Sequence, residues 1–223
     1  MPTRRRIALV VAALAAFGGA GGRSMADAAG DLVRAAAAGE TARVRAALAA
    51  GAPVDARAGR RRTALLLATI GDHVEAARVL IDAGADVNAK DDQQDSPYLY
   101  AGAEGRNAIL MMTLARGADL KSTNRYGGTA LIPAAHHGHP ETVRILLATK
   151  IDVNHVNRLG WTALLEAVIL GDGSKTYQEI VRLLLEGRAD PDIADRDGVS
   201  PLAHAQRRGY GEIAALIRAA GGR

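Results

Sequence analysis

The feature that most constrains the fold of this chain is a self-similarity with a period of about 33 residues. The segment "TALLLATIGDHVEAARVLIDAGADVNAKD" from Thr63 aligns with "TALIPAAHHGHPETVRILLATKIDVNHVN" from Thr129 and with "TALLEAVILGDG" from Thr162. The units start near Gly30, Thr63, Ser96, Thr129, Thr162 and Ser200, so all intervals are equal except the last, which is longer. Such a period predicts one supersecondary unit stacked repeatedly on itself, so that each unit contacts only its neighbours.

Each unit is expected to contain two short helices. A Thr or Ser hydroxyl can cap the first helix at Thr63, Ser96, Thr129, Thr162 and Ser200. The first helix should end nine residues later, where most units have a glycine that permits a left-handed turn: Gly39, Gly105, Gly138 and Gly209. Apolar residues at helical spacing, such as Val143, Leu146 and Leu147, predict the second helix. The chain has one Phe, one Trp and five Tyr, so its apolar core depends on Ala, Leu and Val, which suits close helix packing.

These segments resemble the ankyrin repeat. "TAL" stands for the Thr-Pro-Leu-His start of that repeat, "GHPETVRILL" for its second helix and "GADVNAKD" for its hairpin. The resemblance covers residues 30 to 223 and implies an all-α solenoid of six units, with β-hairpin fingers along one edge and a role in binding other proteins. Chain length and order are also similar to exported bacterial ankyrin repeat proteins, which implies a periplasmic location.

Three positions depart from the repeat pattern. The glycine after the second helix is replaced by Lys150 in the fourth unit and by Arg188 in the fifth, and the finger glycine by Gln94. Because only glycine adopts the left-handed conformation without steric cost, we expect strain or an altered turn there. The terminal units should act as end caps.

The longer, last interval contains "GDGSKTYQE", residues 171–179, whose composition is similar to that of a phosphate-binding loop. A Walker loop needs glycine directly before its lysine and five residues earlier still, but Ser174 precedes Lys175 and Ile169 occupies the earlier position. The stretch is better explained as a five-residue insertion at 172–176, in the turn between two helices. By register it should raise one wall of a groove beside the first helices.

The expected finger tips carry residues typical of interaction hot spots. By register they hold Asp92 and Gln93, Arg125 and Tyr126, Arg158, Leu159 and Trp161, and Arg196 and Asp197. Tyr126 and Trp161, with arginines on neighbouring fingers, form our first candidate partner-binding surface. The alternative is that Trp161 only packs against the next finger.

A second candidate surface follows the fifth residue of each first helix, where leucine is usual in the family. The six units have Arg34, Leu67, Tyr100, Pro133, Glu166 and His204 at this position, and Glu104, His137, Leu170 and Arg208 lie one turn further on. We hypothesise that Tyr100, Glu104, His137, Glu166, Leu170 and His204 line a concave groove that contacts a partner. The alternative is a row of ordinary solvent-exposed polar residues.

The stretch "HHGH", His136 to His139, raises the question of a metal site. Adjacent residues on a helix point about 100° apart, and no carboxylate or cysteine stands at ligand spacing, so convergence of these histidines is not expected. His139 also occupies a position where the family has a structural histidine. The alternative function is a small-ligand or metal-binding protein that uses the polar row of Tyr100, His137, Glu166 and His204, in which His137, Glu166 and His204 from different repeats are the set to examine for a metal. We therefore expect neither a metal nor a cofactor, and no catalytic motif predicts an enzyme.

Residues 1–26 are typical of an export signal: Arg4, Arg5 and Arg6 precede an apolar run from Ile7 to Phe17 and small residues at Ser24 and Ala26. Cleavage after Ala26 or Ala28 fits the small-residue rule, by the secretory or the twin-arginine route; an uncleaved arm is the alternative. The four arginines of this leader account for the excess of 28 basic over 24 acidic residues. The mature chain is therefore formally neutral, and its charge gives no reason to expect nucleic acid or an anionic membrane as a partner.

Together these features predict a signal peptide at 1–26 and a repeat domain at 27–223. The chain has no cysteine, so an exported form has no disulfide bonds and depends on packing for its stability. We expect a periplasmic or secreted monomer, without stable membrane insertion, that binds a partner protein of unidentified nature through the groove and fingers of units three to five.

Overall fold

The computed structural model describes residues 24–223, so most of the predicted signal peptide lies outside the described residues. Twelve α-helices, one 3₁₀ turn and two short strands follow one another in this part of the chain. Their bounds are α1 Met25–Ala37, α2 Thr41–Ala49, β1 Arg57–Ala58, η1 Gly59–Arg61, β2 Arg62–Thr63, α3 Ala64–Ile70, α4 Val74–Asp82, α5 Pro97–Ala103, α6 Asn107–Ala115, α7 Leu131–His136, α8 Pro140–Leu147, α9 Ala163–Ile169, α10 Lys175–Glu186, α11 Pro201–Arg207 and α12 Gly211–Ala219.

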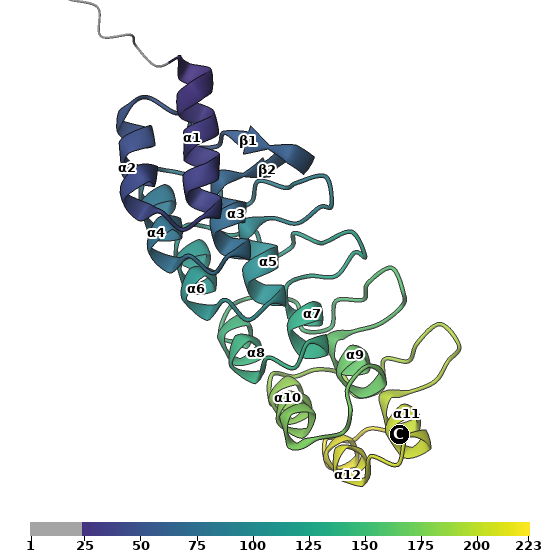
Figure 1. Cartoon of the computed structure of the whole chain (residues 1–223). Helices are drawn as coiled ribbons and strands as arrows, with labels where there is room; N and C mark the ends of the chain where they lie inside the picture. Colours follow the sequence, from purple (N-terminus) through teal and green to yellow (C-terminus); the bar gives the residue numbers. More distant parts are fainter. Residues whose placement is uncertain (1–23) are drawn as a thin grey trace, which may run out of the picture.

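The helices form two parallel rows in a slightly curved stack, which confirms the predicted solenoid (Figure 1). The odd-numbered helices α1 to α11 contact one another in sequence and form the inner row, and the even-numbered helices α2 to α12 form the outer row. The loops that connect successive units project beside the inner row as fingers (Figure 1). Among the described residues only the first finger contains a paired ladder, with β1 antiparallel to β2, and the others are tight turns.

Small and branched apolar side chains fill the space between the two rows. Each inner helix buries alanines against its neighbours, as with Ala134 and Ala135 on α7, while the outer helices bury residues such as Val143 and Leu146. The outer face carries ion pairs between residues three apart, for example Arg182 to Glu179 at 2.6 Å. No helix within residues 24–223 has the length and apolar character that crossing a bilayer requires.

Four of the five predicted helix caps are confirmed, and the fifth is wrong. The hydroxyls of Thr63, Ser96, Thr162 and Ser200 each accept a hydrogen bond from the backbone N–H three residues later. Thr129 does not cap α7, and its buried Oγ1 has no hydrogen-bond partner. Pro133 is the cause, because it has no N–H to donate to the Thr129 carbonyl; the Ile132 N–H donates to that carbonyl instead, at 3.2 Å.

The positions that lack glycine behave in two ways. Gln94 and Arg188 adopt left-handed conformations, with φ of 63° and 67°, as the replaced glycines would. Lys150 does not, so the expected strain is absent there. The Thr149 hydroxyl instead accepts the Ile151 N–H at 3.2 Å and donates to the Leu146 carbonyl at 2.6 Å, which closes the turn by a different route.

The extra residues of the fifth unit are shared between a turn and a helix. The connection between α9 and α10 is longer than the one between α7 and α8, and α10 has 12 residues against 8 in α8. Tyr177, in the added turn of α10, donates a hydrogen bond to the His136 carbonyl at 2.6 Å. The insertion therefore extends an outer helix and is bonded to the neighbouring unit.

Candidate functional site

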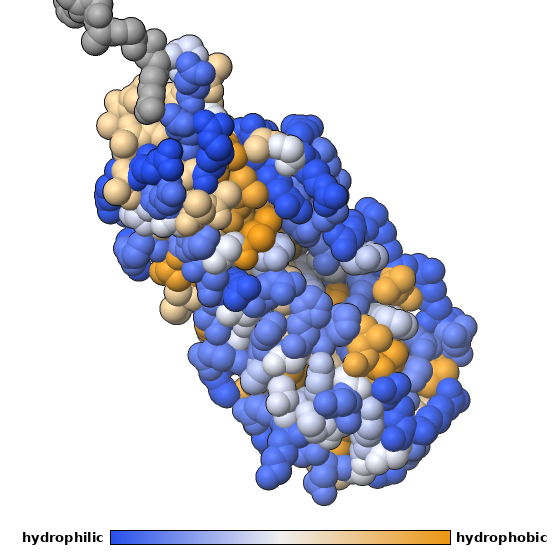
Figure 2. Space-filling model, viewed as in Figure 1, coloured by the Kyte–Doolittle hydropathy of each residue, from blue (hydrophilic) through white to orange (hydrophobic). Residues whose placement is uncertain are grey.

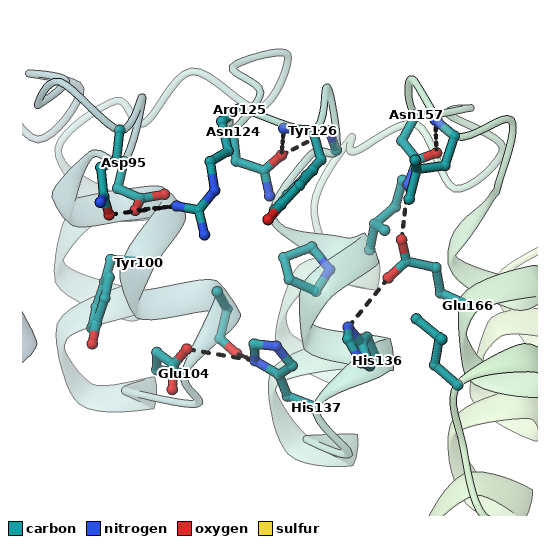
Figure 3. Close-up of a pocket in the computed structure, with 17 residues that line it drawn as sticks. Asp95, Tyr100, Glu104, Asn124, Arg125, Tyr126, His136, His137, Asn157 and Glu166 are labelled. Carbon is teal, nitrogen blue, oxygen red and sulfur yellow. Dashed lines mark hydrogen bonds and ion pairs between the residues drawn. The ribbon is translucent and has the colours of Figure 1, made fainter.

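A groove of ≈ 470 Å³ lies between the inner helices of the third to fifth units and their fingers (Figure 3). The fifth residue of each of these units lies on its inner helix and lines the groove, and these residues are Tyr100, Pro133 and Glu166. Glu104, His137 and Leu170 follow one turn later on the same faces. The period of the repeat therefore places the fifth residues of three successive units side by side. Leucine is usual at this position, and here tyrosine, proline and glutamate take its place and line the groove.

The finger turns that border the groove are held by hydrogen bonds from their own Asx side chains. Asn157 Oδ1 accepts the N–H groups of Leu159 and Trp161 at 2.9 and 3.0 Å, and the Asn157 N–H donates to the Trp161 carbonyl. Asn124 makes the same bonds one period earlier, to Tyr126 and Gly128. These bonds fix the direction of each tip, so Tyr126 and Leu159 are presented on a rigid frame.

Arg125 is engaged with its neighbours on the finger edge of the groove. Its guanidinium lies 3.7 Å from the carboxylate of Asp95 and 4.9 Å from the ring centroid of Tyr126. Burial and the nearby Asp91 carboxylate raise the pKa of Asp95, an effect that Arg125 opposes. The fixed positive charge of the groove thus lies beside the Asp95 carboxylate, while about half of Tyr126 stays open to solvent.

Glu166 on α9 is the buried carboxyl of the site. It is 6% exposed, its Oε1 accepts a hydrogen bond from Asn157 Nδ2 at 2.8 Å, and its Oε2 lies 3.6 Å from His136 Nδ1. Burial raises the pKa of Glu166 to about 7, against the opposing effects of the Asn157 amide and of His137. Near neutral pH the protonation of Glu166 therefore responds to any charge placed beside it.

The three histidines of "HHGH" lie close together, with ring centroids 4.8 Å apart for His136 and His137 and 6.2 Å apart for His137 and His139, but each engages a different partner. His136 lies beside Glu166, and burial together with His137 lowers its pKa. His137 Nδ1 is 2.8 Å from the Ala103 carbonyl and 3.5 Å from Glu104 Oε1. Since a carbonyl only accepts, His137 Nδ1 carries the proton. His139 packs against Gly105, as expected of a structural histidine, and residues 24–223 contain no group of three or more potential ligands that could hold a metal ion.

Eight of the eleven predicted partner-binding residues line this groove: Tyr100, Glu104, Arg125, Tyr126, His137, Leu159, Glu166 and Leu170. Three do not. Arg158 donates hydrogen bonds back to the preceding finger, to the carbonyls of Tyr126 and Arg125. Trp161 closes its finger turn and is half-buried at the base, and His204 is held by Asp195 at 2.7 Å, away from the groove.

The inserted segment does not form the wall that the register suggested. None of the residues 171–179 lines the groove, because the insertion lengthens α10 in the outer row. Gly171 and Gly173 instead lie under the rings of Tyr177 and Tyr210, and Tyr210 Oη donates to the Gly171 carbonyl at 3.0 Å.

The groove also contains residues that the sequence reasoning did not select as site residues. His136, Asn157, Asp95 and Asn124 all line it. A signal for the two asparagines was present, since Asn124 and Asn157 are one period apart at the first position of the finger turn. His136 gave no such signal, because its partner Glu166 lies in the next unit.

Comparison with known proteins gives consistent matches. A family model described as ankyrin repeats in three copies matches residues 32–124 and 99–195. The crystal structure of an ankyrin repeat domain from Acinetobacter baumannii AYE is 58% identical, with a TM-score of 0.84, over 86% of this chain and 98% of that one. The crystal structure of the ankyrin repeat protein EF0377 is 42% identical, with a TM-score of 0.82, over 85% of this chain and 97% of that one.

A curated protein of Escherichia coli K12, the putative ankyrin repeat protein YahD, is 50% identical over 56 residues. That alignment covers 25% of this chain and only 28% of YahD, so it supports the repeat but says little of the whole protein.

Proposed function

Because this chain belongs to the ankyrin repeat family, whose repeats generally serve as protein–protein interaction modules, we propose that it binds a partner protein in the groove of units three to five. Binding would need no chemical step, in keeping with a family whose domains are generally non-enzymatic. The groove supplies a preformed surface of helix side chains below and finger side chains above.

The distribution of exposed apolar side chains carries this proposal. Six large hydrophobic residues are exposed within residues 24–223, and three of them line the groove: Tyr126 at 51%, Leu159 at 46% and Leu170 at 41%. Figure 2 shows apolar patches beside α9 and the fingers, and a further one beside α1 and α3, on a face that is hydrophilic over most of the rest. Exposed apolar groups gathered at one concave place favour a binding site, because isolated ones need no such explanation.

The rigidity of the fingers supports the same function. Main-chain bonds such as the one from the Arg158 N–H to the Tyr126 carbonyl, at 2.9 Å, link one finger to the next. A surface ordered before binding loses less conformational entropy when the partner arrives. The groove can therefore bind a short segment of a partner protein without any folding step in this chain.

The test is affinity capture with a groove variant and a matched control. Tyr126→Ala with Leu159→Ala removes two exposed apolar side chains of the groove, whereas Met111→Ala with Val156→Ala removes two that do not line it. We expect wild type and the control variant to retain the same protein from a periplasmic extract, and the groove variant to lose it. Thermal unfolding should be similar for all three proteins, which separates loss of binding from loss of fold. Equal recovery by the groove variant would refute the proposal.

We also propose that the protein is exported and acts in the periplasm. The arginines at 4–6 and the apolar run at 7–17 support this. Both candidate cleavage positions, after Ala26 and after Ala28, fall in the first turn of α1, where Ala28 is buried. Cleavage would therefore precede folding of α1. Cell fractionation with N-terminal sequencing should find a chain that begins at Asp27 or Ala29; an intact leader on a cytoplasmic protein would contradict export.

A further inference from the structure

The groove contains three acidic side chains, each facing a basic one. Asp95 lies 3.7 Å from Arg125, Glu104 lies 3.5 Å from His137, and Glu166 lies 3.6 Å from His136 (Figure 3). Only the arginine has a permanent charge, and it is engaged by Asp95 and Tyr126. Imidazole groups carry charge mainly below about pH 6.5. Burial lowers the pKa of His136, so at neutral pH and above Glu166 has no charged partner in its pair.

Among the described residues, the only ion-pair partner of the Glu166 carboxylate is His136. On α7 the titratable groups are His136 and His137, and the finger contributes the Asn157 amide and Arg158, whose guanidinium donates to the Arg125 carbonyl. On α11, His204 is bonded to Asp195 and Arg208 donates to the Gly171 carbonyl. On α10, Arg182 is paired with Glu179, while Lys175 there and Arg207 on α11 are exposed to solvent. Arg106, beside α5, is paired with Asp72 at 3.4 Å. The buried carboxyl thus opens into a groove with an excess of negative charge.

Apolar side chains lie beside this negative charge. Pro133, Leu159 and Leu170 line the groove together with Glu166, and Tyr126 adds an aromatic ring at the finger edge. An aliphatic stem that ends in a cation complements such a surface, because the stem contacts the apolar residues and the head reaches the carboxylate. An anionic occupant would be repelled by Glu104 and Glu166 above neutral pH.

We propose that the groove receives a lysine or arginine side chain of the partner protein, paired with Glu166 and flanked by apolar partner residues on Tyr126, Leu159 and Leu170. This inference rests on the proposed function, since it assigns a partner chemistry to the same groove. A peptide segment fits better than a free polyamine, because the apolar rim at Tyr126 and Leu159 needs apolar side chains to cover it.

Such binding is coupled to protons. A cation beside Glu166 stabilises the carboxylate, so binding near pH 7 releases a proton from a group whose pKa is about 7. Acidification protonates Glu166 and also His136, and both changes disfavour a cationic occupant. If only the ionised form of Glu166 binds, affinity should fall about 30-fold between pH 8 and pH 5.5.

A random 12-residue peptide library displayed on phage tests the partner chemistry directly. The full chain, Glu166→Gln and Glu75→Gln are each panned at pH 7.5; Glu75 is an exposed residue of α4 that provides the same change of charge far from the groove. We expect wild type and Glu75→Gln to enrich peptides with a Lys or Arg next to apolar residues, and Glu166→Gln to lose them. Enrichment of acidic peptides, enrichment without any basic residue, or no enrichment at all would overturn the inference.

Calorimetry on the best enriched peptide then checks the role of the cation. We expect the basic residue replaced by norleucine to weaken binding at least tenfold, and proton release in buffers of different ionisation enthalpy to vanish in Glu166→Gln. Spermidine binding as tightly as the peptide would point to a small cation and overturn the inference.

The two proposals can fail separately. Peptides without a basic residue that are lost in Tyr126→Ala with Leu159→Ala would refute the cation but keep the groove as the binding surface. Peptides retained by that groove variant would refute the proposed function itself.

Discussion

Replacing the buried carboxyl of α9 by the neutral amide in Glu166→Gln should change how the stability of the protein depends on pH. The pKa of Glu166 is raised from 4.5 to about 7 in the folded state, chiefly by burial. Between these two values the folded chain binds a proton that the unfolded chain has lost. The free energy of unfolding therefore falls as pH rises through this window, and it levels off above pH 7.

The size of the effect follows from the shift. Each pKa unit corresponds to about 1.4 kcal/mol, so a shift of this size makes the ionised folded state about 3 kcal/mol less stable relative to the protonated one. Glutamine accepts the same hydrogen bond from Asn157 Nδ2 and has no charge to desolvate. We expect Glu166→Gln to resemble wild type near pH 5 and to be more stable by about 3 kcal/mol near pH 8.

Urea unfolding followed by circular dichroism at half-unit steps from pH 5 to pH 8 measures the difference. His136 has a lowered pKa, so it destabilises the fold as pH falls and contributes a slope of the opposite sign in both proteins. Subtracting the two curves removes that contribution to first order. A wild-type curve that runs parallel to that of Glu166→Gln across this range would refute the reasoning, because the carboxyl would then titrate at its ordinary pKa.

Two further predictions concern the backbone of the repeats. Thr129→Val removes a buried hydroxyl that has no hydrogen-bond partner, so it should stabilise the fold by about 1 kcal/mol. Thr162→Val removes the cap of α9, so it should destabilise the fold by about 1 kcal/mol. Urea midpoints that move in the same direction for both variants would contradict this. Gln94 has a left-handed φ of 63°, so Gln94→Gly should raise the free energy of unfolding by about 0.5 to 1 kcal/mol. Gln93 does not have a left-handed φ, so the control variant Gln93→Gly should lower it. Equal effects of the two variants in thermal unfolding would show that the finger backbone is unstrained.

The architecture could be predicted from the sequence because its determinants are local. A capping hydroxyl, a helix-ending glycine and apolar spacing all act within one unit, and their recurrence sets the stack. The failures show where this locality ends. Thr129 matches the capping pattern, but Pro133 in the next turn rearranges the bonding. Lys150 matches the strained position, but the neighbouring Thr149 hydroxyl gives the backbone another solution.

The site was harder to predict because its contacts cross between units. His136 and Glu166 belong to different units of the sequence, yet their side chains lie 3.6 Å apart in the structure. The pattern of polar fifth residues identified Tyr100 and Glu166, since a polar residue at a position that is usually leucine stands out without any structure. That pattern could not identify His136, which reaches the groove from the end of its helix. The sequence also did not distinguish Leu159, at a finger tip, from Trp161, at the base of the same finger.

The fifth position of the repeat unit shows how a few substitutions can add a binding site to a repeated scaffold. Leu67 in the second unit occupies a position that Tyr100, Pro133 and Glu166 take in the next three, while the alanines and leucines that pack the helices stay apolar. Two of the three changes have a cost that the structure makes visible: Pro133 leaves the Thr129 hydroxyl without a partner, and Glu166 is a carboxyl largely removed from water. Costs of this kind, concentrated in adjacent units and facing one groove, are expected where a surface is selected for binding at the expense of stability. If the stability gained by Glu166→Gln comes without any loss of partner binding, that account of Glu166 is wrong.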